Sequence, residues 1–274
     1  SEGEIPLREG SGRENLADAI VAPNNPLAAR VIVNRVWQQF FGRPIVSTPS
    51  NFGALGELPS HPKLLDDLAF RFMKEGWSLK WLQREIVLSA TYGQSSDVDP
   101  VKTAIDPENV MIWRVSRRRL GVEAYRDALL SVSGRLENRS SGKSMQPDEP
   151  DSRHRTLYSE ISRMDLNPLL ARFDFPDPNA HSATRFETTT PLQKLFMLNS
   201  PFLVQQADGL AERIRSSANG NEDKIRFAYE LLLAREPTER ELEIGEAFVS
   251  AGTSEVWSQY AQALLISNEM FMVD

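Results

Sequence analysis

The side chains best suited to binding or acid–base chemistry gather in one short segment, DFPDPNAH. It contains Asp174, Asp177, Asn179 and His181. Carboxylates, an amide and an imidazole so close together could serve a hard cation or form an acid–base pair. Aspartate and asparagine beside proline are also ordinary turn residues that hydrogen-bond their own backbone. The pattern favours a turn, and the acid–base site remains the alternative.

The following segment, SATRFETTTP at 182–191, has the composition of an anion-binding edge. Thr190 is followed by a proline, which marks a helix start whose free N–H groups favour an oxyanion. The hydroxyls of Thr188 and Thr189 add donors, and Arg185 could offer a bidentate fork to sulfate, phosphate or a carboxylated sugar. The alternative is that Thr190 only caps the helix while Arg185 pairs with Glu187 or a nearby aspartate.

A second polar pair lies in NPLAARVIVNRVWQQFFG at 25–42, where Arg30 and Asn34 border an otherwise apolar helical face beside Trp37. Buried polar groups need partners, and a carboxylate such as Asp66 could supply one. We therefore expect Arg30 and Asn34 to form a buried network, with a ligand site as the alternative. A buried Arg30 predicts that Arg30→Ala costs about 3 kcal/mol.

Histidine and cysteine usage restricts the metal chemistry. The sequence has three histidines, His61, His154 and His181, and no cysteine. Thiolate sites, disulfides and haem attachment through a Cys-x-x-Cys-His motif are thus excluded within this chain. Because His154 lies in a polar stretch, too few imidazoles remain for a typical transition-metal site. We expect no metal and no cofactor, and retain His61 as a candidate binding residue.

The charge balance argues against nucleic acid as a partner. With 31 Lys and Arg against 38 Asp and Glu, the net charge is -7, so no global positive field attracts a polyanion. Arg114 and the run 117–119 form a basic cluster, but Glu123 follows Arg119 at the spacing of a helical ion pair. The cluster therefore favours structural salt bridges. The sequence SGKS at 141–144 lacks the first glycine and the strand of a phosphate loop.

The apolar pattern predicts a mainly α fold. Capping residues and helical spacing of apolar side chains predict helices at 14–21, 26–41, 62–75, 78–90, 119–133, 191–198, 201–217, 222–234, 239–251 and 255–268. Thr238 and Glu241 form a capping box. The segment 156–162 is the best strand candidate. No run approaches the roughly 18 apolar residues of a membrane span.

The polar stretch 135–155 has no hydrophobic periodicity and predicts a mobile linker. It would divide the chain into an N-terminal helical half at 1–134 and a C-terminal half at 156–274, or form a loop in one domain. The fold we expect is a multi-helix globular structure with long irregular loops and at most a minor β element.

Several blocks of the chain carry a family resemblance: 25–42, 48–69, 76–96, 106–109 with 113–134, and 188–207. In this order they resemble a planctomycete-specific domain of unknown function, over nearly the whole chain from about residue 14. That domain is usually C-terminal in exported proteins that begin with a cytochrome c-like domain. The resemblance implies a periplasmic or cell-surface location, with haem only in a separate N-terminal domain. The chain itself shows no apolar signal region, and we expect it to be a mature product or a fragment.

Two functional hypotheses follow. The first is a non-catalytic binding or scaffolding module whose partners are neighbouring domains of the same polypeptide, an envelope protein or an anionic polysaccharide. The absence of G-x-S-x-G and H-E-x-x-H motifs favours it. The alternative is a hydrolase that acts on polysaccharide with carboxylates and a histidine in a cleft between the halves.

Overall fold

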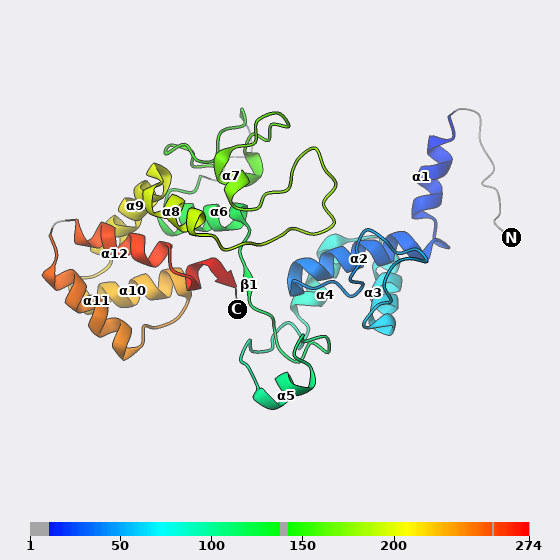
Figure 1. Ribbon diagram of the computed structural model, residues 1–274, viewed down its shortest axis with the longest axis horizontal. Helices are drawn as coiled ribbons and strands as arrows, with labels where there is room; N and C mark the ends of the chain where they lie inside the picture. The colour runs from blue at the N-terminus through cyan, green and yellow to red at the C-terminus, as the bar shows by residue number, and fades with distance from the viewer. Residues whose placement is uncertain (1–10, 138–141, 254, 274) are drawn as a thin grey trace. The chain divides into compact units, whose positions relative to one another are not determined.

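The computed structural model describes residues 11–137, 142–253 and 255–273 and divides into two compact units (Figure 1). Unit 1 runs to Arg117 and unit 2 comprises Arg118–Val273. The described residues contain 12 α-helices and one two-stranded sheet. Helices account for 53% of the structure, which confirms the mainly α fold with a minor β element. No helix in these ranges is long and apolar enough to cross a membrane.

Unit 1 is built on three helices that share one core. Its α-helices are α1 (Arg13–Val21), α2 (Pro26–Phe41), α3 (Pro62–Lys74), α4 (Leu79–Val87) and α5 (Pro100–Ile105). Helix α2 has both predicted caps: the Asn25 side chain accepts from the Leu27 N–H at 3.0 Å, and Gly42 adopts a φ of 73°. The apolar faces of α2, α3 and α4 bury Val33, Leu65 and Leu82.

The polar pair of α2 is not one buried network. Asn34 is fully buried, and its side chain accepts from the Val46 N–H at 2.8 Å and donates to the Val46 carbonyl at 3.1 Å. Arg30 instead pairs at 2.7 Å with Asp66, and both side chains are substantially exposed. The prediction was right for Asn34 and wrong for Arg30, because one helical turn moves Arg30 to the rim of the core.

Unit 2 packs its helices around a larger core. Its elements are β1 (Arg118–Arg119), α6 (Val122–Val132), η1 (Thr156–Tyr158), α7 (Pro168–Arg172), α8 (Pro191–Asn199), α9 (Pro201–Ser217), α10 (Asn221–Leu233), α11 (Glu239–Ala251), α12 (Val256–Leu265), η2 (Glu269–Phe271) and β2 (Met272–Val273). Helices α9 and α12 form its most extensive helix pair. Strands β1 and β2 are antiparallel, with Arg119 opposite Met272.

Three local predictions need correction. Helix α6 begins at Val122, so Arg119 lies in β1 and cannot form a helical pair with Glu123. The predicted strand at 156–162 is absent: residues 156–158 form the 3-10 turn η1, and 159–162 are irregular apart from an isolated bridge at Ser159. The short helices α5 and α7 were not predicted, although Asp99 and Asn167 cap them by accepting backbone N–H groups.

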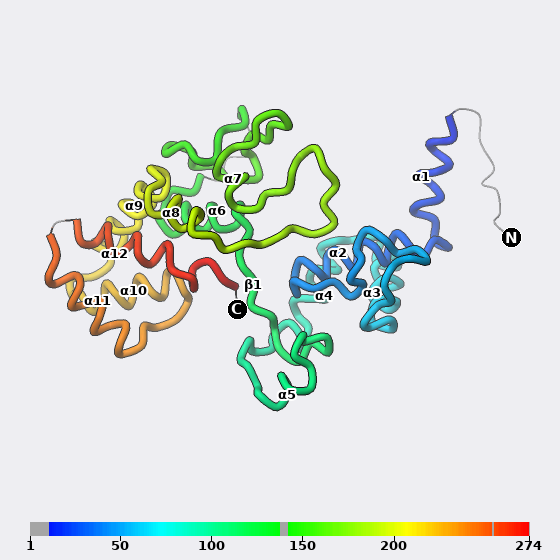
Figure 2. The backbone as a smooth tube through the Cα atoms, in the orientation of Figure 1, coloured from blue at the N-terminus to red at the C-terminus, as the bar shows by residue number. Residues whose placement is uncertain are grey.

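The segment 135–155 does not separate the two units. The division falls between Arg117 and Arg118, and the polar segment belongs to unit 2 together with the helices on either side. Residues 138–141 lie outside the described residues. Ser152 in the remainder is buried, and the described part of the segment forms irregular loops (Figure 2). The mobile-linker interpretation therefore does not fit residues 142–155, whose carbonyls contact a buried arginine.

An arginine with two carboxylate partners fixes the turn between α10 and α11. Arg235 donates to both oxygens of Glu241 at 2.9 Å and to Glu269 at 2.6 and 2.7 Å. Glu241 also completes the predicted capping box with Thr238. The hydrogen bonds from Arg235 lower the pKa of Glu241 to about 2.

This lowered pKa predicts an acid-sensitive contribution to stability. A depressed carboxyl pKa stabilises the fold above the unfolded value of about 4.5, and the contribution is lost as the pH falls towards 2. The free energy of unfolding should fall between pH 5 and pH 3 as Glu241 becomes protonated. Because the Arg235–Glu241 pair is partly solvated, we expect Glu241→Gln to make this fall about 1 kcal/mol smaller. Urea denaturation at both pH values measures it. The exposed Glu243→Gln on the same helix is the control and should leave the pH dependence unchanged.

Candidate functional site

A cavity of about 260 Å³ lies in unit 2, between the start of α8 and the C-terminal η2–β2 segment. We call it the cationic cavity; it is lined by Arg119, Thr189, Gln193, Lys194, Met197, Asn268, Phe271 and Met272. The β1–β2 register places Arg119 beside Met272, and the capping box of Thr190 and Gln193 fixes the first turn of α8. Two of the lining residues are cations and none is a carboxylate.

Arg119 is the more deeply buried cation, with a side chain only 10% exposed. Its Nη1 lies 3.4 Å from Asp174 Oδ2, which is a long contact for an ion pair. Its Nε is buried and has no hydrogen-bond partner among the described residues. The guanidinium lies over the rings of Phe271 at 4.9 Å and Phe173 at 5.8 Å. Burial thus leaves a donor of a permanent cation unsatisfied, which is costly without a ligand.

Lys194 supplies the second cation from α8. Its ammonium donates to the Ile266 carbonyl and to Asn268 Oδ1, both at 3.0 Å, and lies 6.0 Å from the centre of the Phe271 ring. Burial and the neighbouring charge of Arg119 lower the pKa of Lys194. An ammonium has three hydrogens to donate, so these two hydrogen bonds do not exhaust it.

Asp174 is the carboxylate that contacts Arg119, but the protein itself also uses it in a turn. At a φ of 63°, Asp174 accepts from the backbone N–H and the hydroxyl of Thr188, each at 2.8 Å. Gln193, which is buried, also donates to the Thr188 hydroxyl at 3.2 Å. The predicted donor Thr188 is therefore already paired with an internal anion, and Asp174 is part of a structural turn.

The other donors predicted for 182–191 are also occupied. Arg185 forms a bidentate pair with Glu123 at 2.7 and 2.8 Å, and Thr190 caps α8. Burial alone would raise the pKa of Glu123, but the hydrogen bonds from Arg185 outweigh it and the pKa is lowered. Arg185, Thr188 and Thr190 therefore follow the alternative of capping and internal pairing, with Glu123 as the partner of Arg185. Thr189 is different, because it lines the cationic cavity.

The remaining candidates do not join this site. Asp177 accepts from the Asn179 N–H at 2.8 Å, as the turn interpretation predicts, and His181 is exposed. His61 lies in unit 1, where its Nδ1 is 3.0 Å from the Ser60 hydroxyl at the start of α3. Among the described ranges, no three histidine or carboxylate side chains converge as a metal site would require.

A wider depression beside α6 and α9 is less suited to an anion. Its lining mixes three arginines with Asp208 and Glu212, and two of the arginines, Arg135 and Arg213, donate to backbone carbonyls. Arg213 donates to the Ser131 and Val132 carbonyls at the end of α6, at 3.0 and 2.6 Å. Arg213 therefore stabilises the C-terminus of α6, where positive charge is favourable. The cationic cavity therefore remains the better candidate.

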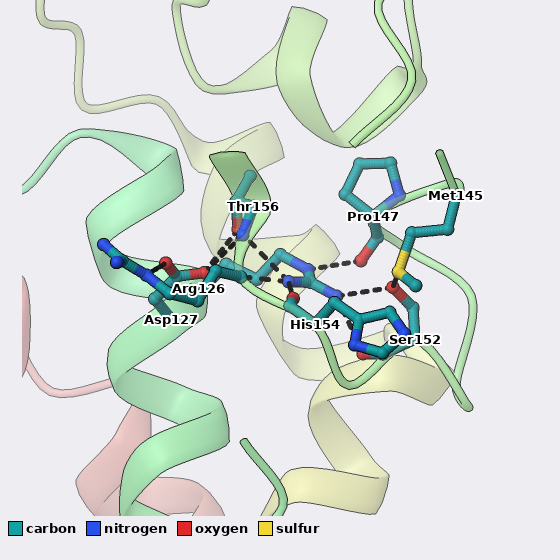
Figure 3. Close-up of polar contacts among 8 residues, drawn as sticks. Arg126, Asp127, Met145, Pro147, Ser152, His154 and Thr156 are labelled. Atoms are coloured by element: carbon teal, nitrogen blue, oxygen red, sulfur yellow. Dashed lines mark hydrogen bonds and ion pairs between the residues drawn. The ribbon is translucent and has the colours of Figure 1, made fainter. Parts of the chain in front are cut away.

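Sequence reasoning missed the most deeply buried charge in unit 2. Arg126 is 1% exposed and donates to the carbonyls of Pro147, Ser152 and His154 at 2.6–2.8 Å (Figure 3). Its Nη groups also donate to the hydroxyls of Ser152 and Thr156. Burial lowers the pKa of Arg126 to about 10. The available signal was an arginine on the apolar face of α6, between Val122 and Leu129.

Asp127 completes this cluster from the side. Its Oδ1 accepts from the N–H and the hydroxyl of Thr156, both at 2.7 Å, and its Oδ2 lies 3.4 Å from Arg155 (Figure 3). Each hydrogen bond that Arg126 donates is accepted by a protein oxygen, so the cluster is structural and holds the segment 145–156 in place. It differs in this respect from Arg119, whose Nε has no such acceptor.

Comparisons with known proteins identify one family for this chain. No curated protein and no solved structure matches the chain. One family matches over residues 12–249, which is most of the chain. The chain therefore belongs to the PSD1 family, described as a protein of unknown function (DUF1553).

Proposed function

We propose that this chain is a non-catalytic binding module and that it takes an anionic ligand in the cationic cavity of unit 2. The observation that carries the proposal is the unbalanced charge of the lining. Arg119 and Lys194 face one aromatic ring, Phe271, and no carboxylate lines the cavity. Two like charges so close together are unfavourable, and a bound anion would relieve their repulsion.

The geometry supports binding over hydrolysis. A carboxylate pair for glycoside cleavage must face its substrate with one member held protonated. Asp174 instead accepts two hydrogen bonds from Thr188, and Asp177 accepts from its own turn. We therefore do not propose hydrolysis, because both carboxylates are engaged in turns of the protein itself.

The setting of this module is also proposed, from the family resemblance. We place it outside the cytoplasm, in the periplasm or at the cell surface, beside a separate haem-binding domain or an envelope protein. An acidic polysaccharide is one source of anionic groups in such a setting. Nucleic acid is not proposed, because the net charge of -7 opposes it.

Calorimetric titration with three anions tests the proposed function: inorganic sulfate, phenylacetate and polygalacturonate. We expect saturable binding of at least one of them, weakened about tenfold or more by Lys194→Met. The reason is that a hydrogen bond to a charged group contributes about 1.5–3 kcal/mol. Melting curves without ligand check that the variant is folded.

Lys224→Met is the matched control. Lys224 is also a half-buried lysine of unit 2, and its ammonium lies 5.7 Å from the centre of the Trp257 ring on another face of the helical core. Its removal should leave anion binding unchanged. The proposal is wrong if none of the three anions binds, or if both lysine variants weaken binding equally.

A further inference from the structure

We infer that the cationic cavity selects a small carboxylic acid with an apolar body about the size of one aromatic ring. This inference rests on the proposed function and adds the chemical class of the ligand. It follows from three properties of the described residues: the volume of the cavity, the unused edge of the Arg119 guanidinium, and the apolar walls opposite the two cations.

The volume sets the size of the ligand. The cavity measures about 260 Å³, whereas an apolar cavity of about 150 Å³ suffices for benzene. The additional space accommodates a carboxylate and one or two linking carbons. Ligand pockets commonly measure about 300–1,000 Å³, so this cavity is at the small end. A single ring with one acidic group fills it.

The Arg119 guanidinium determines which charged group the ligand should carry. Asp174 contacts only Nη1, and the Nε–H on the other edge of the guanidinium is buried without a partner, so a ligand reaches it after a small rotation of the Arg119 side chain. A guanidinium binds a planar carboxylate through two parallel N–H groups, and Nε–H is one of the donors in that arrangement. Lys194 lies across the Phe271 ring and can reach the same carboxylate with its remaining hydrogen.

The apolar walls of the cavity determine which uncharged part of a ligand fits there. Met197, Phe271 and Met272 present sulfur and carbon atoms to the cavity, and methionine side chains adapt to the shape of what they contact. A sugar acid would place its hydroxyls against these atoms with few partners, which is unfavourable. An aromatic or branched aliphatic acid instead buries its carbon surface there, at about a fourfold gain in affinity per methylene.

The β1–β2 pair links the charged and apolar parts of the cavity. Arg119 and Met272 are register partners, so one short sheet carries both the cation and an apolar wall. Met272 is 41% exposed, which makes it the wall residue that can be changed with the least effect on the core. A variant at Met272 therefore tests recognition of the ligand's apolar body separately from recognition of its carboxylate.

Calorimetry on the full chain with three probes tests the inference: phenylacetate, acetate and the neutral 2-phenylethanol. We expect phenylacetate to bind at least about tenfold more tightly than acetate and than 2-phenylethanol, because each analogue lacks one half of the recognition. Met272→Ser should weaken phenylacetate several-fold and leave acetate unchanged. Met164→Ser, at a side chain 95% exposed elsewhere in unit 2, is the matched control and should change neither.

The outcomes separate this inference from the proposed function. Equal binding of phenylacetate and acetate, or of phenylacetate and 2-phenylethanol, overturns the selection for an apolar acid. If sulfate or polygalacturonate then still binds in a Lys194-dependent manner, the anion-binding function stands and only the ligand class is wrong. If no anion binds at all, both proposals fail.

Discussion

Replacing Arg126 with methionine is expected to lower the free energy of unfolding of unit 2 by about 3–5 kcal/mol. Methionine fills part of the space but leaves the carbonyls of Pro147, Ser152 and His154 without their donor. Each buried carbonyl that loses its partner costs about 1–3 kcal/mol. Since a domain is stable by only about 5–15 kcal/mol, we expect amide hydrogen exchange in α6 and in residues 142–156 to accelerate strongly.

Arg155→Met is the matched control for this prediction. Arg155 belongs to the same segment and lies 3.4 Å from Asp127, but its side chain is 56% exposed. An exposed ion pair contributes at most about 1 kcal/mol, so this variant should remain close to wild type in urea denaturation. Equal losses for the two variants would show that the segment is not held by Arg126.

Helix positions were predictable from the sequence because their signals are local. Thr238 and Glu241 are three residues apart, and the structure contains both hydrogen bonds of their capping box. Helices α9 and α11 have the predicted bounds, and α2 begins and ends where Asn25 and Gly42 require. A cap depends on atoms within one turn of the chain, so its chemistry can be read without knowledge of the tertiary fold.

Charge partners were not predictable in the same way, because they are fixed by tertiary packing. Glu123 has Arg119 at helical spacing in the sequence but pairs with Arg185, from a distant loop. Arg119 contacts Asp174, which is also distant along the chain. Periodicity places a residue on a helix face and gives no information about which loop will cover that face.

In the segment 182–191 the donors have the predicted chemistry, but their partners belong to the protein itself. Its donors do bind a carboxylate, but the carboxylates are Asp174 and Glu123 of the same chain. The cationic cavity next to it depends on Lys194 and on Phe271, which lie in a predicted helix and near the chain's C-terminus. Neither residue had a motif that would have marked it, so only the folded structure brings them together.

Asn34→Ala is expected to destabilise unit 1 by about 2–6 kcal/mol. The side chain of Asn34 is fully buried and makes both hydrogen bonds of the Val46 backbone, which lies in the loop after α2. Its removal leaves one buried N–H and one buried carbonyl unsatisfied, at about 1–3 kcal/mol each. Urea denaturation measures the loss, and hydrogen exchange at the Val46 amide should report local opening first.

Arg30→Ala, one turn away on the same helix, should cost no more than about 1 kcal/mol, which replaces the larger loss expected from the sequence. Its partner Asp66 is 57% exposed, so water solvates that carboxylate once the arginine is gone. The buried Val46 backbone groups that pair with Asn34 have no such compensation from water, which is why the two substitutions should differ in cost. A loss of about 3 kcal/mol for Arg30→Ala, or a loss below about 1 kcal/mol for Asn34→Ala, would contradict this assignment of roles.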